Sequence, residues 1–309
     1  MRLAEPRKLG QGPGMIPRSA SVSIIGFGEA GATFASAGAW AGAARVFDRL
    51  TEGADTRGAK IDDYRSAGVV GCDVLDTAVA GAGLILSLVT ADQALAVAHQ
   101  AARSLTAGAL YCDLNSVAPE TKRAAAAVVE SAGAHYIDVA VMSPVEPAAL
   151  AAPLLLSGAR TAEAAVSLSD LGFANIRVVG TQVGRASSIK MIRSVMIKGL
   201  EALSAECILA ASEAGVLDEV LASLDASWPG ADWGRRVDYN LDRMMVHGLR
   251  RSAEMEEVVR TLEDLGVGSE MSRGTVARQA AIGSLGLKAP SPGLLSKIAA
   301  LLQQRAQAA

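Results

Sequence analysis

Three glycines at a fixed spacing are the residues of this sequence whose chemistry is clearest. Gly26, Gly28 and Gly31 follow the apolar run Val22–Ile25, and an alanine-rich stretch from Ala32 to Trp40 comes next. A strand, a G-x-G-x-x-G turn and a helix in this order are typical of dinucleotide binding. The first glycine permits the tight turn, the second admits a pyrophosphate near the backbone, and the third lets the helix pack on the strand. The start of the helix would offer free N–H groups to the phosphates.

Asp48 and Arg49 bear on which dinucleotide binds. Asp48 follows the next apolar run, about twenty residues beyond the turn, where a carboxylate accepts hydrogen bonds from ribose hydroxyls. Because a carboxylate repels a 2′-phosphate, Asp48 favours NAD, whereas the neighbouring Arg49 could hold that phosphate and keeps NADP open. The predicted cofactor-binding residues are Gly26, Phe27, Gly28, Glu29, Ala30, Gly31, Asp48, Arg49, Val89 and Thr90.

Lys190 is a second candidate for chemistry. It belongs to a segment that is apolar on most of its helical surface, which is typical of a buried helix. One polar stripe at three- and four-residue spacing crosses that surface: Ser187, Lys190, Ser194, Lys198 and Glu201. A partly buried lysine can serve as a general base near neutral pH. Periodicity alone favours the other interpretation, a solvated face on which Lys198 pairs with Glu201.

The elements that must position these residues alternate between short apolar runs and helical stretches from residue 21 to residue 180. The predicted strands are Val22–Ile25, Arg45–Phe47, Leu84–Leu88, Ala109–Cys112, His135–Val139, Leu154–Ser157 and Ile176–Val178. This alternation predicts an α/β Rossmann-type domain with a doubly wound, mostly parallel sheet. The ligand crevice of such a sheet lies beyond the carboxyl ends of its strands. The glycine turn, Asp48, Val89–Thr90 and Asp113–Ser116 should therefore meet at one crevice.

Helical periodicity replaces this alternation after Gly180 and continues to the end of the chain. We expect a mobile tail over residues 1–19 and an NAD(P)-binding Rossmann domain over residues 20–182. An all-helical domain for substrate binding and dimerisation would follow over residues 183–309. A long helix, at about residues 187–214, would join the two domains.

Four motifs in order give the chain a resemblance to the β-hydroxyacid dehydrogenase superfamily, which includes 6-phosphogluconate and 3-hydroxyisobutyrate dehydrogenases. They are the glycine turn, the segments Asp113–Arg123 and Asp138–Pro144, and the helix that holds Lys190. The stretch Lys190–Ser194 and the segment Arg251–Glu257 resemble a poorly characterised branch of the family. Its C-terminal domain is similar to a phosphogluconate-dehydrogenase-like module of unknown specificity. The resemblance covers about residues 20 to 290.

This resemblance implies an NAD(P)-dependent enzyme that oxidises a small β-hydroxy acid or reduces the keto acid. Lys190 would be the general acid and base, and Ser194 would orient the reacting oxygen. Asn115 and Ser116 would bind the acid group of the substrate, beside the helix that Pro119 opens.

The chain departs from the family pattern at two places near the expected substrate. Ser194 stands where the family usually has Asn, so one hydroxyl replaces an amide. Met142 and Ser143, followed by Pro144, stand where the family usually has Ser-Gly-Gly. Met142 and Ser143 are still expected to contact substrate. Because Met142 makes this part of the substrate site larger and more apolar, we expect a substrate that is bulkier or less polar than a phosphorylated sugar acid.

A cluster at helical spacing could add to the site from the second domain: Arg243, His247, Arg250, Arg251 and Glu254. In the family this domain helps to close the site, and His247 is the predicted substrate contact. The alternative is a surface helix with ordinary ion pairs.

Charge and composition exclude several partners. The formal net charge is −3 and there is no basic block with interleaved aromatic residues, so neither nucleic acid nor an anionic membrane is expected. No apolar run approaches the ~20 residues that span a bilayer. Cys72, Cys112 and Cys207 are widely spaced, and the three histidines form no ligand cluster, so we expect no bound metal and a reduced, cytoplasmic protein. Family habit implies a homodimer.

Two other functions stay open. An imine or ketone reductase would share this architecture, although such reductases usually replace the lysine. A dinucleotide-binding sensor that has lost catalysis is compatible with Ser194 and with the changed wall at Met142.

Overall fold

The computed structural model describes residues 21–38, 40, 42, 44–287 and 292–308, so the predicted tail over residues 1–19 lies outside the described residues. The chain forms two compact units, of which the first ends at Lys190 and the second begins at Met191. The boundary that we propose from the sequence, after residue 182, lies where the strands end and the long helix begins. Each unit is described separately below.

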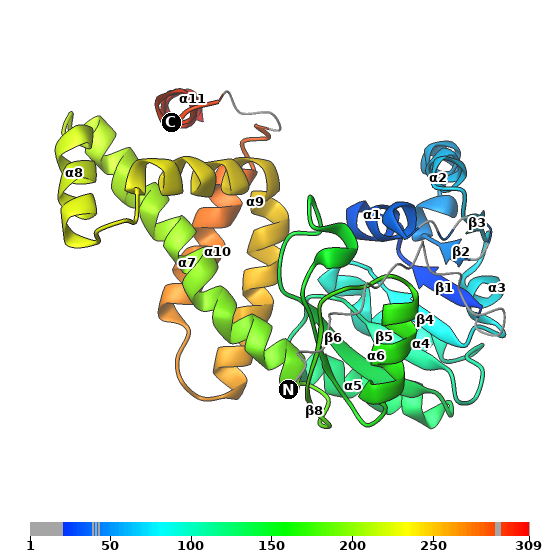
Figure 1. Cartoon of the computed structure of the whole chain (residues 1–309). Helices are drawn as coiled ribbons and strands as arrows, with labels where there is room; N and C mark the ends of the chain where they lie inside the picture. The colour runs from blue at the N-terminus through cyan, green and yellow to red at the C-terminus, as the bar shows by residue number, and fades with distance from the viewer. Residues whose placement is uncertain (1–20, 39, 41, 43, 288–291, 309) are drawn as a thin grey trace, which may run out of the picture. The chain divides into compact units, whose positions relative to one another are not determined.

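An eight-stranded sheet organises the described part of the first unit (Figure 1). Its strands are β1 (Val22–Ile25), β2 (Ala44–Phe47), β3 (Val70–Gly71), β4 (Leu84–Ser87), β5 (Leu110–Asp113), β6 (His135–Val141), β7 (Leu154–Ser157) and β8 (Ile176–Gly180). The spatial order is β3-β2-β1-β4-β5-β6-β7-β8, and every pair is parallel except β6 with β7. The chain reverses direction of winding between β1 and β4, which is where ligands bind in such sheets.

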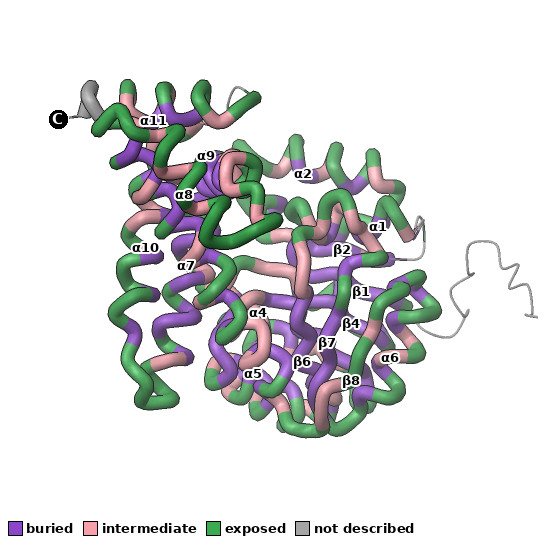
Figure 2. The backbone as a smooth tube through the Cα atoms, turned by 60° about the vertical axis from the view of Figure 1, so that its left-hand side comes forward, coloured by how far each residue is buried: buried purple, intermediate pink, exposed green. Residues whose placement is uncertain are grey.

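Helices cover both faces of this sheet, because successive strand residues point to opposite sides. Ile24 packs in one apolar cluster and the next residue, Ile25, in the other. The first cluster is closed by α1 (Glu29–Ala37), α2 (Ala54–Ser66) and α6 (Thr161–Asp170), and the second by α3 (Leu75–Val79), α4 (Ala94–Ala101) and α5 (Pro119–Ser131). The central strands are buried throughout (Figure 2), as expected of a sheet with helices on both faces. Short 3-10 turns lie at Arg49–Thr51, Ala91–Gln93 and Ala149–Ala151.

The described part of the second unit is helical. It comprises most of α7 (Arg185–Glu213), whose first residues belong to the first unit, and α8 (Leu217–Ser227), α9 (Trp233–Asp264), α10 (Glu270–Gly283) and α11 (Leu294–Ala308). Ile208, Leu241 and Ile282 are among the side chains of its core. Gly248 and Gly283 let α9 and α10 approach closely, since a Cβ on Gly248 would lie 2.7 Å from the Gly283 Cα.

These two architectures confirm the predicted fold class, a Rossmann-type domain followed by a helical region. The strands β2, β4, β5, β6 and β8 begin or end one or two residues from their predicted bounds. β3 was not expected, because it is a two-residue edge strand with exposed side chains, and β6 runs on to Val141. In the described residues, no helix is both long and apolar enough to cross a membrane.

Candidate functional site

The glycine turn after β1 is held by groups from two other elements. Asp48, at the end of β2, accepts hydrogen bonds from the Phe27 N–H through Oδ2 (2.7 Å) and from the Leu50 N–H through Oδ1 (2.9 Å). The Lys60 ammonium, on α2, donates to the Phe27 carbonyl at 2.9 Å. Both sides of the turn are therefore fixed, and the Asp48 carboxylate supports the turn whether or not it also meets a ribose.

The three glycines of the turn are required for different reasons. Gly26 has φ +87°, and a Cβ there would lie 2.5 Å from the Leu88 carbonyl oxygen. A Cβ on Gly31 would lie 2.6 Å from the Gly26 carbonyl oxygen. A Cβ on Gly28 would meet no atom of the described residues within 4 Å, so none of these residues demands glycine there. Open space over the second glycine, at the start of α1, fits the close approach of a pyrophosphate.

The other predicted cofactor residues lie around this turn. Phe27 and Gly31 are buried, Ala30 and Val89 are half-buried, and Glu29, Arg49 and Thr90 are exposed. Backbone hydrogen bonds join the turn to the neighbouring strands, from the Gly26 N–H to the Phe47 carbonyl and from the Leu88 N–H to the Ile25 carbonyl, each at 2.8 Å.

Asn115 connects the end of β4 to the predicted substrate loop. Its Oδ1 accepts from the Val89 N–H at 2.7 Å, and its Nδ2 donates to the Ser87 Oγ at 3.0 Å. Its own N–H donates to Asp113 Oδ1 at 2.8 Å, and only 4% of the residue is exposed. Asn115 therefore fixes the loop after β5 against the end of β4. Its predicted contact with substrate stays a prediction.

Lys190 and Ser116 are brought together within the first unit. The Lys190 Nζ donates to the Ser116 Oγ at 2.5 Å, and both residues are half-buried. Ser116 follows Asn115 in the loop before α5, and Lys190 lies in the second turn of α7. The structure therefore does not support the interpretation of Lys190 as a solvated side chain, because its ammonium lies against the predicted substrate loop.

Tyr136 and Cys112, two buried titratable groups beneath the loop, are kept in their neutral forms. Burial, reinforced by the Asp113 charge, raises the pKa of Tyr136 well above its usual value, so the hydroxyl stays protonated and donates to Asp113 Oδ2 at 2.5 Å. Burial raises the pKa of the Cys112 thiol to about 12, with the Asp113 charge adding to the shift. Neither group is placed to exchange protons with a ligand near neutral pH, and both support the loop.

Met142 and Ser143 continue from β6. The Met142 N–H donates to the Pro153 carbonyl at 2.9 Å, and its side chain lines a hollow with Leu155 and Asn175, beside β7 and β8. The Ser143 Oγ donates to the Pro144 carbonyl at 3.1 Å. The contacts of Met142 thus connect it to the β7–β8 side of the sheet.

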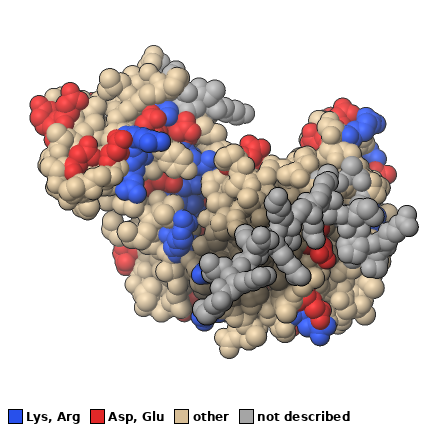
Figure 3. All heavy atoms as spheres, in the orientation of Figure 1, with Lys and Arg blue, Asp and Glu red and all other residues tan. Residues whose placement is uncertain are grey.

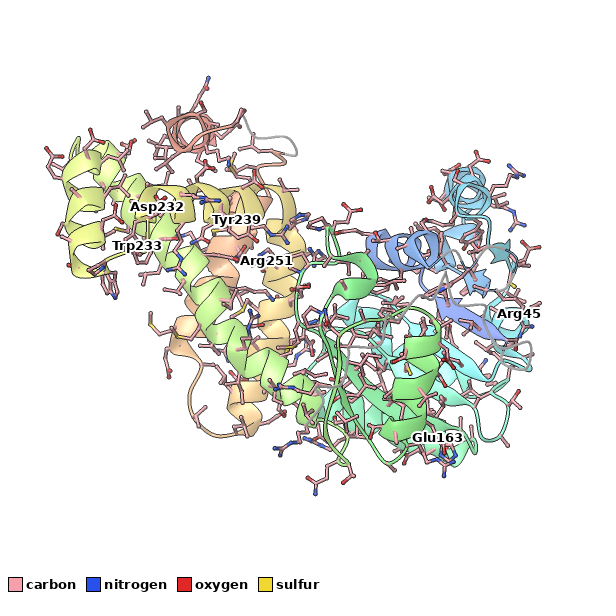
Figure 4. The ribbon with its side chains drawn as sticks, viewed as in Figure 1. Arg45, Glu163, Asp232, Trp233, Tyr239 and Arg251 are labelled. Carbon is pink, nitrogen blue, oxygen red and sulfur yellow. The ribbon has the colours of Figure 1, made fainter. Side chains whose placement is uncertain are left out.

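Lys198 and Glu201, the last two residues of the polar stripe, are buried in the second unit. The pair expected between them is wrong. Lys198 pairs with Glu254 at 2.7 Å, and Glu201 pairs with Arg251. The Gln279 Nε2 amide also donates to Glu201 Oε2 at 2.9 Å, and Lys198 and Glu201 do not form the predicted pair. Burial lowers the pKa of Lys198, and Glu254 offsets only part of that shift. Arg251, labelled on α9 in Figure 4, is therefore a core residue of the helical unit and not part of a surface ion pair.

Ordinary surface pairs also occur on this helix. Arg250, with half of its side chain exposed, pairs with Glu254 at 2.7 Å, and basic and acidic side chains lie next to one another on the face of this unit in Figure 3. Ser194 is buried and His247 half-buried, and both belong to the second unit. Their predicted contacts with substrate stay predictions. Among the described residues, no group of three or more His, Cys, Asp or Glu could hold a metal ion.

Two residues that sequence reasoning did not select support the loop and the lysine. Lys122 and Asp138 are completely buried and lie 3.5 Å apart between Nζ and Oδ1. A signal for Lys122 was present, because it shares helical spacing with the buried side chains of Ala125, Ala126 and Val129 and so had to face the core.

Comparison with known families agrees with this geometry. Residues 21–171 match the NAD binding domain of 6-phosphogluconate dehydrogenase, and residues 211–282 match a domain of unknown function, DUF1932. A conserved hypothetical protein from Sinorhizobium meliloti 1021 is 36% identical, with 94% of this chain and 98% of that chain covered and a TM-score of 0.72. The conserved protein MTH1747, whose structure is described as similar to 3-hydroxyacid dehydrogenases, is 30% identical over 85% of this chain and 96% of its own, with a TM-score of 0.65.

A solved 3-hydroxyisobutyrate dehydrogenase from Mycobacterium tuberculosis shares the fold, at 16% identity, over 93% of this chain and 99% of that one, with a TM-score of 0.71. The fold and the glycine turn define a nicotinamide-dinucleotide-binding protein of the oxidoreductase type. The chain belongs to the β-hydroxyacid dehydrogenase superfamily, in the branch with a C-terminal DUF1932 domain.

Proposed function

We propose that the protein is a nicotinamide-dependent dehydrogenase that oxidises a small β-hydroxy acid, or reduces the keto acid, with Lys190 as general acid and base. The observation that carries the proposal is the 2.5 Å hydrogen bond from the Lys190 Nζ to the Ser116 Oγ. It joins a half-buried ammonium to the loop that follows β5, at the carboxyl edge of the sheet where ligands bind.

The residues of the first unit divide the reaction between them. Lys190 takes the proton of the substrate hydroxyl in oxidation, and in reduction its ammonium polarises the carbonyl and returns the proton. Ser116, with Asn115 behind it, receives the acid group of the substrate, and the N-terminus of α5 at Pro119 favours an anion there. The roles proposed for Ser194, Met142, Ser143 and His247 rest on the family resemblance.

The glycine turn, Asp48 and Val89–Thr90 would hold the dinucleotide. The bound nicotinamide supplies the hydride acceptor. We propose NAD as the preferred form, because the Asp48 carboxylate would repel a 2′-phosphate, with NADP as the alternative because Arg49 is exposed next to it. Comparing the binding of the two dinucleotides by titration calorimetry separates these forms.

The test of this function is a panel of β-hydroxy acids, assayed by reduction of NAD or NADP. We expect turnover with at least one acid, and Lys190→Ala should lower it at least ~10²-fold, the usual contribution of a placed acid–base group. Cofactor affinity should be unchanged in that variant. Arg193→Ala, on the exposed side of the same helix, is the matched control and should retain turnover. Turnover that survives Lys190→Ala would contradict the assignment.

The same panel tests the alternatives. Reduction of cyclic imines or ketones without oxidation of any hydroxy acid would identify an imine or ketone reductase. Cofactor binding without turnover across both panels would identify a non-catalytic sensor. Lys190 beside Ser116 favours the dehydrogenase over both, since a sensor needs no acid–base group there.

We further propose that the protein is a cytoplasmic homodimer that associates through the helical unit. Ile192, Met196 and Leu203 are exposed on α7 at spacings that share one face, and 62% of Met196 is accessible. Light scattering of the wild type should give twice the chain mass, and Met196→Glu should give the monomer mass. A wild-type monomer at micromolar concentration would contradict the dimer.

A further inference from the structure

Three buried ionisable groups lie beneath the candidate site in the first unit. Lys122 on α5, Asp113 at the end of β5 and Asp138 in β6 are each 0% exposed. The Lys122 Nζ lies 2.6 Å from the Asp113 carbonyl oxygen, 3.0 Å from Asp113 Oδ1 and 3.5 Å from Asp138 Oδ1. One ammonium therefore lies between two carboxylates that come from neighbouring strands.

Asp138 holds the start of the helix that carries Lys190. Its Oδ2 accepts from the Gly184 N–H (3.1 Å), the Ser187 N–H (3.0 Å) and the Ser187 Oγ (3.1 Å), and it also receives the Ser157 hydroxyl at 3.1 Å. The first N–H groups of a helix lack partners within the helix, and a carboxylate there is favoured by the helix dipole. Asp138 thus fixes the first turn of α7, and Lys190 follows in the next turn.

Asp113 holds the loop after β5, which carries Ser116. Its Oδ1 accepts from the Asn115 N–H at 2.8 Å, and its Oδ2 receives the Tyr136 hydroxyl at 2.5 Å. Ser116, the partner of the Lys190 ammonium, is the next residue of the same loop. The Asp113 and Asp138 carboxylates are therefore hydrogen-bonded to the two backbone segments that carry Ser116 and Lys190.

Stability alone does not account for this arrangement. Buried ion pairs replaced by well-packed apolar side chains often leave stability unchanged or improve it, because desolvation of the charges offsets their attraction. Removing one partner alone is costly, since the remaining charge is buried without compensation. Such a network can instead select one arrangement of the segments that it joins.

We propose that Lys122 is the positioning residue of the candidate site. Its ammonium couples the loop at residues 113–116 to the first turn of α7, so that the Lys190 Nζ and the Ser116 Oγ are held within hydrogen-bond distance. Lys122 acts through Asp113 and Asp138 and does not touch a ligand. The importance of this coupling for catalysis rests on the proposed function, whereas the coupling itself does not.

Hydrogen exchange by mass spectrometry on the full chain tests the coupling without any substrate. Lys122→Met should raise exchange in both segments, residues 113–118 and 184–190, by at least about tenfold, because local opening becomes easier there. Lys60→Met is the matched control, since Lys60 is also a buried lysine but contacts the Phe27 carbonyl and Asp63. It should raise exchange near residue 27 and leave the two segments protected.

Two results would overturn the proposal: unchanged exchange in either segment, or a uniform rise over the whole chain, which would indicate a purely structural lysine. If Lys122→Met does not fold, the double variant Lys122→Met/Asp113→Asn is measured in the same way, because it removes one of the two buried carboxylate charges that Lys122 faces and restores the net charge of the group. It should fold and still exchange faster in both segments; full protection of both segments in the double variant would also overturn the proposal.

A kinetic readout then separates positioning from the proposed function. With any acid that the panel identifies, Lys122→Met should lower kcat about tenfold or more with little change in KM or in cofactor affinity, and Lys122→Arg should restore part of kcat. An unchanged kcat would contradict the positioning role while leaving the dehydrogenase intact. A panel without turnover would contradict the proposed function, and the exchange data would still decide the coupling.

Discussion

The Lys190 Nζ lies 2.5 Å from the Ser116 Oγ, and this hydrogen bond joins the second turn of α7 to the loop after β5 inside the first unit. The bond needs both segments to be fixed. Asp138 fixes the helix through the Ser187 N–H, and Asp113 fixes the loop through the Asn115 N–H. The position of the proposed acid–base group is thus set by buried carboxylates that do not themselves line the site.

Removing the Ser116 hydroxyl should weaken catalysis less than removing the lysine. Hydrogen bonds to charged groups contribute about 1.5–3 kcal/mol, so Ser116→Ala should lower kcat/KM roughly 10- to 100-fold by releasing the ammonium. Steady-state kinetics with an acid from the panel measures this change. Ser131→Ala, which removes an exposed hydroxyl at the end of α5, is the control and should have wild-type kinetics. Wild-type kinetics in Ser116→Ala would show that the lysine is oriented without it.

The second and third glycines of the turn should fail in different ways when replaced by alanine. Gly28→Ala places a methyl group in open space over the turn, so stability should change little and affinity for NAD should fall at least about tenfold. Gly31→Ala drives a methyl group to 2.6 Å from the Gly26 carbonyl oxygen, and such overpacking costs about 1–3 kcal/mol of stability.

Thermal unfolding and calorimetric titration with NAD, run on both variants, separate these effects. The expected pattern is a Gly28→Ala variant that melts like the wild type and binds weakly, and a Gly31→Ala variant that melts earlier. Tight NAD binding by Gly28→Ala would mean that the space over the turn is not where the pyrophosphate lies.

The sequence was enough to predict the sheet, because its strands are short apolar runs between helical stretches. β3 was missed since Val70 and Gly71 form a two-residue exposed edge, with no apolar run to reveal it. The antiparallel direction of β7 could not be predicted either, because strand composition carries no information about direction. It depends on the short connection from β6 through residues 142–153.

The site was predictable only as far as single residues signal their own chemistry. Lys190 and Ser116 were both selected from the sequence and lie within hydrogen-bond distance, whereas the partners of Lys198 and Glu201 were assigned wrongly. Three- and four-residue spacing predicts pairs within one helix. Both residues instead pair with α9, and Lys198 and Glu254 are 56 positions apart in the sequence. Pairing between distant segments depends on the packing of the helices, which no local pattern contains.

The buried pair in the helical unit should matter strongly for stability. Arg251→Met leaves Glu201, which is 3% exposed, as a buried carboxylate without its arginine partner, and breaking one side of such a pair costs about 3–5 kcal/mol. Urea unfolding measures the loss. Arg251→Met/Glu201→Gln should recover most of it, because the residual charge is gone. Arg250→Met, at a half-exposed pair, should cost no more than about 1 kcal/mol, and an equal loss in the two single variants would contradict the buried assignment.

Lys198 should make stability depend on pH in a defined direction. Burial lowers its pKa in the folded protein below the ordinary value of 10.5, and the Glu254 charge offsets only part of that shift. Between the lowered pKa and 10.5 the unfolded chain therefore binds more protons at this residue than the folded protein, so the free energy of unfolding rises with pH. This contribution is complete above 10.5 and is lost as the pH falls through the lowered pKa.

Urea unfolding of the wild type and of Lys198→Met at a series of pH values isolates this contribution, since other titrating groups cancel in the difference. The stability of the wild type relative to the variant should increase as the pH approaches 10.5 from below. Arg250→Met, which alters the other partner of Glu254 at the surface, should give a difference that is flat over the same range. A flat or falling difference for Lys198→Met would mean that the ion pair with Glu254 outweighs burial, and that the lysine is held as a stable cation in the core of the helical unit.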